Sequence, residues 1–360
     1  MELKSLEKRF IRKFSNKRWA LLAAVTVGIV IISILLGILV GSVPISVLDT
    51  IKIIIGKMFG LSLFEGEKGT ELIIWEIRFS RVVLAFLVGA SLALAGAAFQ
   101  GLLRNTLADP YTLGVSSGAS LGAVAVLFFQ LPSSLLGGYT QPIVAIICGI
   151  LTLVIVLVIT NMTTGKTGNE TIILAGIIIS SFFSAVISLL IALTPREDIA
   201  NILNWTMGSV AMRGWGHVQL ILPFFIIGAV IVLYHFRELN AMALGEQSAQ
   251  FIGMDVKKKK TMILIGASIL TGSAVAVSGA IGFVGLVIPH LIRLIVGANH
   301  RYVLPFSLVY GGAYLVLADL LARTVIAPKE LPIGVVTALI GSPIFALLLI
   351  RQRMKSKGAR

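Results

Sequence analysis

The sequence predicts an all-α integral membrane protein with about ten transmembrane helices. Of its 360 residues, 57% are hydrophobic and 13% are charged, and the mean hydropathy is +0.99. A soluble domain is about 45–50% apolar and about one quarter charged. Most of this chain's surface therefore needs a non-aqueous solvent. The 36 glycines fit this class, because small residues let membrane helices approach closely.

Apolar runs recur along the whole chain, and a membrane helix needs about 20 mostly apolar residues. The first run is too long for the apolar core of a cleavable signal peptide. The eighth contains Pro289, His290 and Arg293, so we expect a short helix that lines protein rather than lipid. The ten expected spans are 19–40, 82–103, 113–131, 142–162, 171–194, 217–236, 261–281, 283–297, 302–322 and 332–350.

Basic residues sit in short clusters between these runs. The net charge of +14 is therefore typical of orientation signals rather than of nucleic-acid binding. With the N-terminus inside, 21 of the 30 Lys and Arg residues lie on the inner side, which predicts that both termini are cytoplasmic. We expect a basic N-terminal segment over 1–18, one transmembrane domain over 19–350 and a basic tail over 351–360.

Catalytic chemistry is not expected in this chain. Cys148 is the single cysteine, and the four histidines are scattered without metal-ligand spacing. The triplet Gly165-Lys166-Thr167 resembles the end of a phosphate-binding loop, but Thr160 replaces the earlier glycine. A turn at the membrane edge explains it better. The sequence therefore predicts no enzyme, no cofactor and no metal site.

Two further features are open to more than one interpretation. Asp319 and Arg323 stand four apart, so they can pair on one helical face, either as an internal ion pair or as a contact for a substrate or partner. The inner segment 237–260 is too polar to span a membrane. Its residues 239–253 are expected to form two short amphipathic helices hinged at Gly245.

Several sequence blocks, in order and with ordinary spacing, resemble the FecCD-type permeases of ABC importers, which move iron-siderophores, haem and cobalamin. The similarity covers nearly the whole chain after Trp19. The blocks are 77–122 (beginning IRFSRVV), 174–177 (LAGI), 205–209 (WTMGS), 239–253 (LNAMALGEQSAQFIG), 278–305 (SGAIGFVGLVIPH onward), 318–323 (ADLLAR) and 330–349 (ELPIGVV onward).

The resemblance implies a BtuC-like ABC importer permease fold in a bacterial cell membrane. It implies four kinds of partner: a second permease subunit, two ATP-binding-cassette subunits that hydrolyse ATP, an extracytoplasmic binding protein and the lipid bilayer. It does not imply nucleic acid. The first expected cargo is an Fe(III)-siderophore, with cobalamin and then haem as alternatives. A secondary transporter would explain the spans but not the inner segment, and no constellation supports a membrane enzyme or receptor.

The resemblance also assigns three sets of residues. The coupling helices would push against the ATPase through Leu239, Ala243, Gly245, Glu246, Ala249 and Gly253, although an ordinary solvated loop is the alternative. Arg78, Arg81 and Arg323 would receive acidic side chains of the binding protein, although Arg78 and Arg81 could instead anchor lipid headgroups. The cytoplasmic gate would comprise Asn105, Leu107, Asn169 and Glu170.

The gate is also where the sequence departs from the family pattern. The usual Asn-Pro-Leu-Ala-Asp-Pro turn reads Asn105-Thr106-Leu107-Ala108-Asp109-Pro110. Losing the first proline releases a backbone N–H, and this change is expected to loosen the turn. Glu170 likewise places a charge where a small polar residue is more usual.

Overall fold

The computed structural model describes residues 16–41, 43–164 and 169–357, and these residues form helices and no strands. The Gly165-Lys166-Thr167 triplet, residues 1–15 of the basic N-terminal segment and residues 358–360 of the tail lie outside the described residues.

Ten apolar helices match the ten predicted spans in order. Seven are long enough to cross a membrane, and three are shorter. The long ones are α2 (Asn16–Leu39), the continuous helix Lys68–Leu103, α7 (Thr140–Thr164), α8 (Asn169–Leu193), α10 (Gly214–Tyr234), α13 (Val256–Ser278) and α15 (His300–Thr324). The shorter apolar stretches are α6 (Val115–Phe128), α14 (Val284–Val296) and residues Ile333–Leu348 of α16 (Ile333–Lys357).

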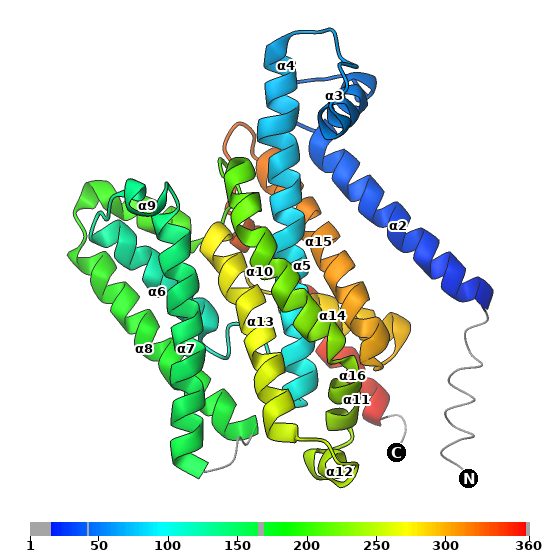
Figure 1. Ribbon diagram of the computed structural model, residues 1–360, viewed down its shortest axis with the longest axis vertical. Coiled ribbons are helices and arrows are strands. Elements are labelled where there is room, and N and C mark those ends of the chain that lie inside the picture. The colour runs from blue at the N-terminus through cyan, green and yellow to red at the C-terminus, as the bar shows by residue number, and fades with distance from the viewer. Residues whose placement is uncertain (1–15, 42, 165–168, 358–360) are drawn as a thin grey trace.

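Helix α5 (Ser80–Leu103) is the centre of the molecule, with α10, α13, α14 and α15 packed around it (Figure 1). Close packing depends on two pairs of glycines. A Cβ on Gly89 would overlap the carbonyl oxygen of Gly311 in α15, and one on Gly96 would overlap that of Gly285 in α14. Helix backbones therefore touch directly, as small residues allow in membrane proteins. The short helix α14 lies mostly buried, as predicted for the eighth span.

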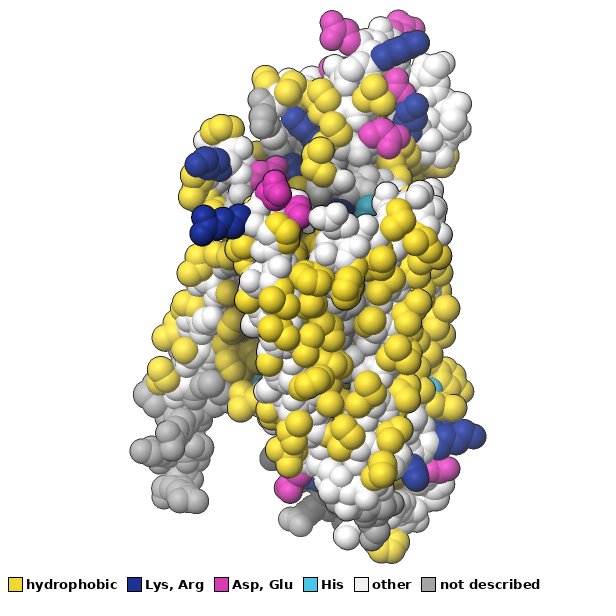
Figure 2. Space-filling view, turned by 90° about the vertical axis from the view of Figure 1, so that its left-hand side faces the viewer, with side chains coloured by type: hydrophobic (Ala, Val, Ile, Leu, Met, Phe, Trp, Pro, Cys, Tyr) yellow, Lys and Arg dark blue, Asp and Glu magenta, His cyan; other side chains and the backbone are white. Residues whose placement is uncertain are grey.

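The outermost helices expose most of their apolar surface. Only 22% of the apolar stretch of α2 and 17% of that of α8 is buried, against 89% for the helix containing α5. On the face shown in Figure 2, hydrophobic side chains cover the middle and charged side chains lie towards both ends. This distribution fits a bilayer around the middle of the bundle.

The segment before α5 corrects the sequence prediction, which began the second span at residue 82. The helix begins at Lys68 with α4 (Lys68–Leu72) and passes through a π-helical segment, η1 (Ile73–Phe79), into α5. Trp75 and Phe79 of this extension pack on Trp215, with ring centroids 5.0–5.5 Å apart. The Trp215 indole also donates to the carbonyl oxygen of Trp75 at 3.0 Å. These contacts stabilise helical structure where charged residues interrupt the apolar run.

The two ends of the bundle carry different short elements. Helices α3 (Val47–Phe59), α4 and α9 (Arg196–Thr206) and the 3₁₀ turn η2 (Ser133–Leu136) lie at one end, called here the outer end. The end of α16, α11 (Phe236–Ala243) and α12 (Glu246–Phe251) lie at the other, the inner end, and α2 runs from the outer end towards that side and starts near mid-height of the molecule (Figure 1). The ten predicted spans, an even number, would place both chain ends on the same side.

Candidate functional site

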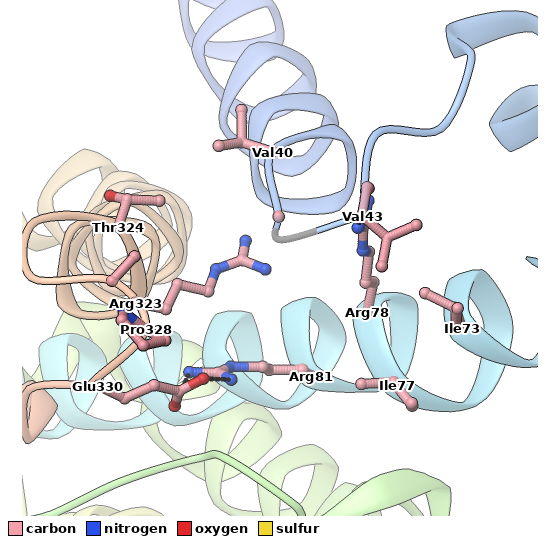
Figure 3. Close-up of a pocket in the computed structure, with 12 residues that line it drawn as sticks. Val40, Val43, Ile73, Ile77, Arg78, Arg81, Arg323, Thr324, Pro328 and Glu330 are labelled. Carbon is pink, nitrogen blue, oxygen red and sulfur yellow. Dashed lines mark hydrogen bonds and ion pairs between the residues drawn. The ribbon is translucent and has the colours of Figure 1, made fainter.

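The structure brings the three outer arginines together around one cavity. Arg78 extends from η1, Arg81 from the first turn of α5 and Arg323 from the last turn of α15. All three line an outer cavity of about 380 Å³ beside the end of α2 (Figure 3). We call these three residues the arginine cluster. Sequence reasoning assigned these three residues to one docking site, and the structure brings all three to the lining of this cavity.

Arg78 is bound to the backbone at the end of α2. Its Nη1 donates to the carbonyl oxygens of Ile38 at 3.1 Å and Leu39 at 3.2 Å, and its Nη2 donates to that of Val43. The last carbonyl groups of a helix lack intrahelical partners and carry partial negative charge, so they suit a guanidinium. Arg78 is only 5% exposed and joins α2 to the π-helical segment.

Arg81 holds two carboxylates at once. Its Nε and Nη2 donate to Asp319 of α15 at 2.9–3.1 Å, and its Nη1 and Nη2 donate to Glu330 at 2.9 Å. The side chain of Asp319 is 1% exposed, whereas that of Glu330 is 44% exposed. The hydrogen bond from Arg81 holds the pKa of Glu330 below its usual value. Sequence reasoning quoted the block that contains Glu330 but gave this residue no role.

The pairing of Asp319 with Arg323 is weaker than the sequence suggested. The closest approach of the two side chains is 3.8 Å, from Arg323 Nε to Asp319 Oδ2, which is too long for a hydrogen bond. Arg323 donates through Nη2 to the carbonyl oxygen of Gly37 instead. Three guanidinium groups face two carboxylates, so the site keeps one excess positive charge.

At the inner end, α11 and α12 are separated at Gly245, as the sequence predicted. Gly245 has φ +124° and ψ 143°, a conformation that is essentially restricted to glycine. Of the predicted coupling residues, Leu239 and Ala249 are buried against the bundle, while Ala243 and Gly253 are exposed. Glu246, the first residue of α12, pairs with Lys260 of α13 at 2.9 Å.

Sequence reasoning missed the most exposed apolar side chains of this segment. Leu244, Phe251 and Ile252 are 80%, 90% and 75% exposed. They flank the two ends of α12, which protrudes from the inner end of the bundle in Figure 1. We call these three residues the apolar tip. Their apolar character was visible in the sequence, but their exposure depends on which face of α12 packs inward.

The predicted gate residues lie around the inner ends of α5 and α8. Asn105 follows Arg104, which has φ +52° and ends α5, and its Oδ1 accepts a hydrogen bond from the Leu107 N–H at 2.9 Å. This side-chain turn closes the loop although Thr106 replaces proline. Asn169 begins α8 and donates to the carbonyl oxygen of Leu102 at 3.4 Å. Leu107 and Glu170 are exposed.

This arrangement defines a class of protein. In the described part of the chain, seven apolar helices are long enough to cross a membrane and three shorter apolar helices pack with them. A charged cavity lies at one end of this bundle and a protruding segment at the other. Within the described ranges, no three His, Cys, Asp or Glu side chains are grouped so that they could hold a metal ion. The architecture is that of the membrane-spanning subunit of a transporter.

Comparison with known proteins identifies the family. The chain belongs to the FecCD transport family, whose description matches residues 29–351. It is 49% identical over 350 residues to the uncharacterized ABC transporter permease protein YvrB of Bacillus subtilis, covering 96% of this chain and 98% of YvrB. It is 42% identical over 283 residues to the cobalamin import system permease protein BtuC of Halobacterium salinarum, covering 79% of this chain and 74% of that protein.

A solved structure, described as an inward-facing conformation of a metal-chelate type ABC transporter, superposes with a TM-score of 0.78. It is 31% identical and covers 91% of this chain and 97% of its own. The protein is therefore an ABC importer permease of the FecCD family and a multi-pass membrane protein. Permeases of this kind work with ATPases and substrate-binding proteins. This chain is a transport component and not an enzyme, because ATP hydrolysis belongs to the ATPase partner.

Proposed function

We propose that this permease imports a ferric siderophore across a bacterial cell membrane. Two relatives from Bacillus subtilis support this cargo. One is named for iron(3+)-hydroxamate import and is 32% identical, and the other is named for Fe(3+)-citrate import and is 37% identical. The similarity to a metal-chelate type transporter over 91% of the chain carries the broader proposal that the cargo is a metal chelate.

Cobalamin and haem are the second candidates. Relatives named for cobalamin and hemin transport are 42% and 41% identical to this chain, which is closer than the two iron-chelate relatives. Identity between permeases is a weak guide to cargo, because affinity in such importers is expected to reside in the binding protein.

The cargo is tested by titrating the cognate binding protein with ferric hydroxamates, ferric citrate, haem and cobalamin. Tight binding of one ferric siderophore, with much weaker binding of its iron-free form, is the expected result. Uptake of the same chelate into vesicles that contain this permease and its ATPase completes the test. Preferential binding and uptake of haem or cobalamin would refute the siderophore proposal.

The arginine cluster is proposed as the docking site for the binding protein. Its excess positive charge at the outer end suits acidic side chains on a partner, and complementary charges accelerate encounter and set register. Glu330, the most exposed charged group of the site, then competes with the partner for Arg81.

The inner segment 236–253 is proposed to couple this chain to the ATPase. The observation that carries this role is the apolar tip, since three exposed apolar side chains on a protruding segment indicate a protein contact. Leu239, Met242 and Ala249 are at most 1% exposed and anchor the segment to the bundle. The proposed assembly contains two permease subunits, identical or homologous, and two ATP-binding-cassette subunits. Asn105, Leu107, Asn169 and Glu170 remain the proposed cytoplasmic gate.

A further inference from the structure

Four consecutive lysines, residues 257–260, follow Val256 in the first turns of helix α13. Lys257 and Lys258 are exposed and Lys259 is half-buried, but Lys260 is only 1% exposed. Lysine is almost never fully buried unless its ammonium group is paired. The first residues of this run fit the orientation signal expected from the sequence, whereas the burial of Lys260 requires a different explanation.

The Lys260 ammonium group joins two parts of the inner end. Its Nζ donates to Glu246 Oε1 at 2.9 Å and to Asn169 Oδ1. Asn169 in turn donates from Nδ2 to the carbonyl oxygen of Leu102, in the last turn of α5, at 3.4 Å. Glu246 is the first residue of α12, and Asn169 is the first residue of α8. A continuous series of polar contacts therefore runs from the coupling segment to the inner ends of α8 and α5.

We propose that Lys260 is a positioning residue that transmits movement of α12 to the gate at the inner ends of α8 and α5. The proposal rests on the proposed coupling and gate roles. A buried ammonium group separated from its partners is strongly unfavourable, so Glu246 and Asn169 must move with it. An ammonium group also has three donors, enough to hold both residues at once. Displacement of α12 by the ATPase therefore displaces the start of α8.

The neighbouring residue provides a matched control. Lys259 Nζ pairs with Glu238 Oε1 of α11 at 2.9 Å, and the two side chains are 31% and 18% exposed. This pair also joins α13 to the coupling segment, but among the described residues its hydrogen bonds and ion pairs reach no residue of α8 or α5. Lys259→Met thus removes a comparable ion pair without breaking the connection to the gate.

The experiment measures the gate directly, so it does not require the cargo. Thr106, exposed between two of the gate residues, is replaced by cysteine in a Cys148→Ser background. The permease is reconstituted with its ATPase subunits in lipid nanodiscs. The rate of maleimide labelling at Thr106→Cys is measured without nucleotide and with ATP and vanadate, alongside ATP hydrolysis. Lys260→Met, Lys259→Met and Gly245→Ala are compared with the parent.

The parent and Lys259→Met are expected to change their labelling rate on binding ATP. In Lys260→Met the labelling rate with ATP and vanadate, divided by the rate without nucleotide, is expected to be about 1, because nucleotide no longer biases the gate. ATP hydrolysis is expected to persist in this variant. If Lys260→Met does not assemble, Asn169→Leu, which leaves Lys260 paired with Glu246, is expected to lose the response in the same way.

The proposal would be overturned if Lys260→Met kept the same ratio of labelling rates as the parent. If Lys260→Met does not assemble, the same ratio in Asn169→Leu as in the parent would overturn it. Loss of ATPase assembly in Lys260→Met with a parental ratio in Asn169→Leu would also overturn it, because the lysine would then serve docking alone. The Gly245→Ala variant separates failure of the Lys260 proposal from failure of the proposed coupling role of the inner segment. If Gly245→Ala abolishes the response but Lys260→Met does not, only the role of Lys260 fails. If both keep the response, the coupling role of the segment fails as well.

Discussion

Arg81 connects a buried carboxylate to an exposed one, and this connection determines how the docking site can be tested. Asp319 is 1% exposed and receives most of its hydrogen bonds from Arg81. Reversing the charge at Arg81 would leave Asp319 buried beside a second negative charge, and breaking a buried pair costs about 3–5 kcal/mol. Loss of docking in such a variant would therefore report misfolding as readily as a lost contact.

Glu330→Gln is the sharper change at this site. It removes the exposed competitor for Arg81 and leaves the buried pair with Asp319 intact. We expect faster association with the binding protein at low salt, and we expect the gain to shrink at high salt because exposed charges are screened. Surface plasmon resonance on the reconstituted permease measures both rates.

The matched control for this change is Glu76→Gln. Glu76 is exposed on the neighbouring π-helical segment and has no ion pair among the described residues. It therefore carries the general charge effect without the contact to Arg81. Equal acceleration in both variants would contradict competition for Arg81, and so would no acceleration in Glu330→Gln.

Asp109, in the turn after α5, provides a pH-dependent prediction. Burial raises its pKa from 3.8 to about 6, although the Tyr111 N–H opposes part of that shift. Between these values the native state binds more protons than the unfolded state, so stability falls as pH rises from about 4 to about 7. Asp109→Asn is expected to remove this slope and to stabilise the protein at pH 7 by roughly 1–3 kcal/mol. Thermal unfolding in detergent at several pH values measures the pH dependence of stability in both proteins. Parallel profiles of stability against pH for the parent and Asp109→Asn would contradict the prediction.

At the scale of elements, the short helices α11 and α12 depend on one backbone conformation. Gly245 has φ +124° and ψ 143°, and forcing another residue into this region costs about 1–3 kcal/mol. The sequence identified the hinge because glycine stands between two amphipathic stretches. It did not identify the apolar tip, because exposure of Leu244, Phe251 and Ile252 follows from the docking of the opposite face.

Gly245→Ala is therefore expected to turn α12 away from its position and to uncouple ATP hydrolysis from uptake. The measurement is binding-protein-stimulated ATPase activity together with vesicle uptake of the chelate that the binding protein prefers. Gly28→Ala in α2 is the control, since no atom lies within 4 Å of the added methyl group and φ at Gly28 is not positive. Normal stimulation and uptake in Gly245→Ala would contradict the role of this hinge.

The helix that contains α5 shows the limit of periodicity as a guide to element boundaries. Glu76, Arg78 and Arg81 interrupt the apolar run, so the sequence predicted a connection before residue 82. The helix begins at Lys68 because Trp75 and Phe79 pack on Trp215, and because the arginines find carbonyl and carboxylate partners. Burial that depends on partners far away in the sequence cannot be predicted from the local pattern of apolar residues.

At the scale of the whole molecule, the inner and outer ends are assigned by charge, and this assignment can be tested. Phe251 at the apolar tip is 90% exposed, and Phe59 in α3 is 71% exposed. Each is replaced by cysteine in a Cys148→Ser background. In right-side-out membranes, an impermeant maleimide is expected to label Phe59→Cys and not Phe251→Cys, and inverted membranes are expected to reverse this. The opposite pattern would invert the assigned orientation.

The sequence by itself determined the class, the ten apolar helices in their order and the hinge at Gly245, and it predicted that both chain ends lie on the same side of the membrane. Each follows from local quantities: the length of an apolar run, the position of basic residues and the conformational freedom of glycine. The tertiary structure decided the rest. Arg81 meets Asp319 and Glu330, which stand 238 and 249 positions away, and Lys260 meets Asn169, 91 positions away. Which charged side chain meets which partner depends on how the helices of the bundle pack around α5, and no local pattern encodes that packing.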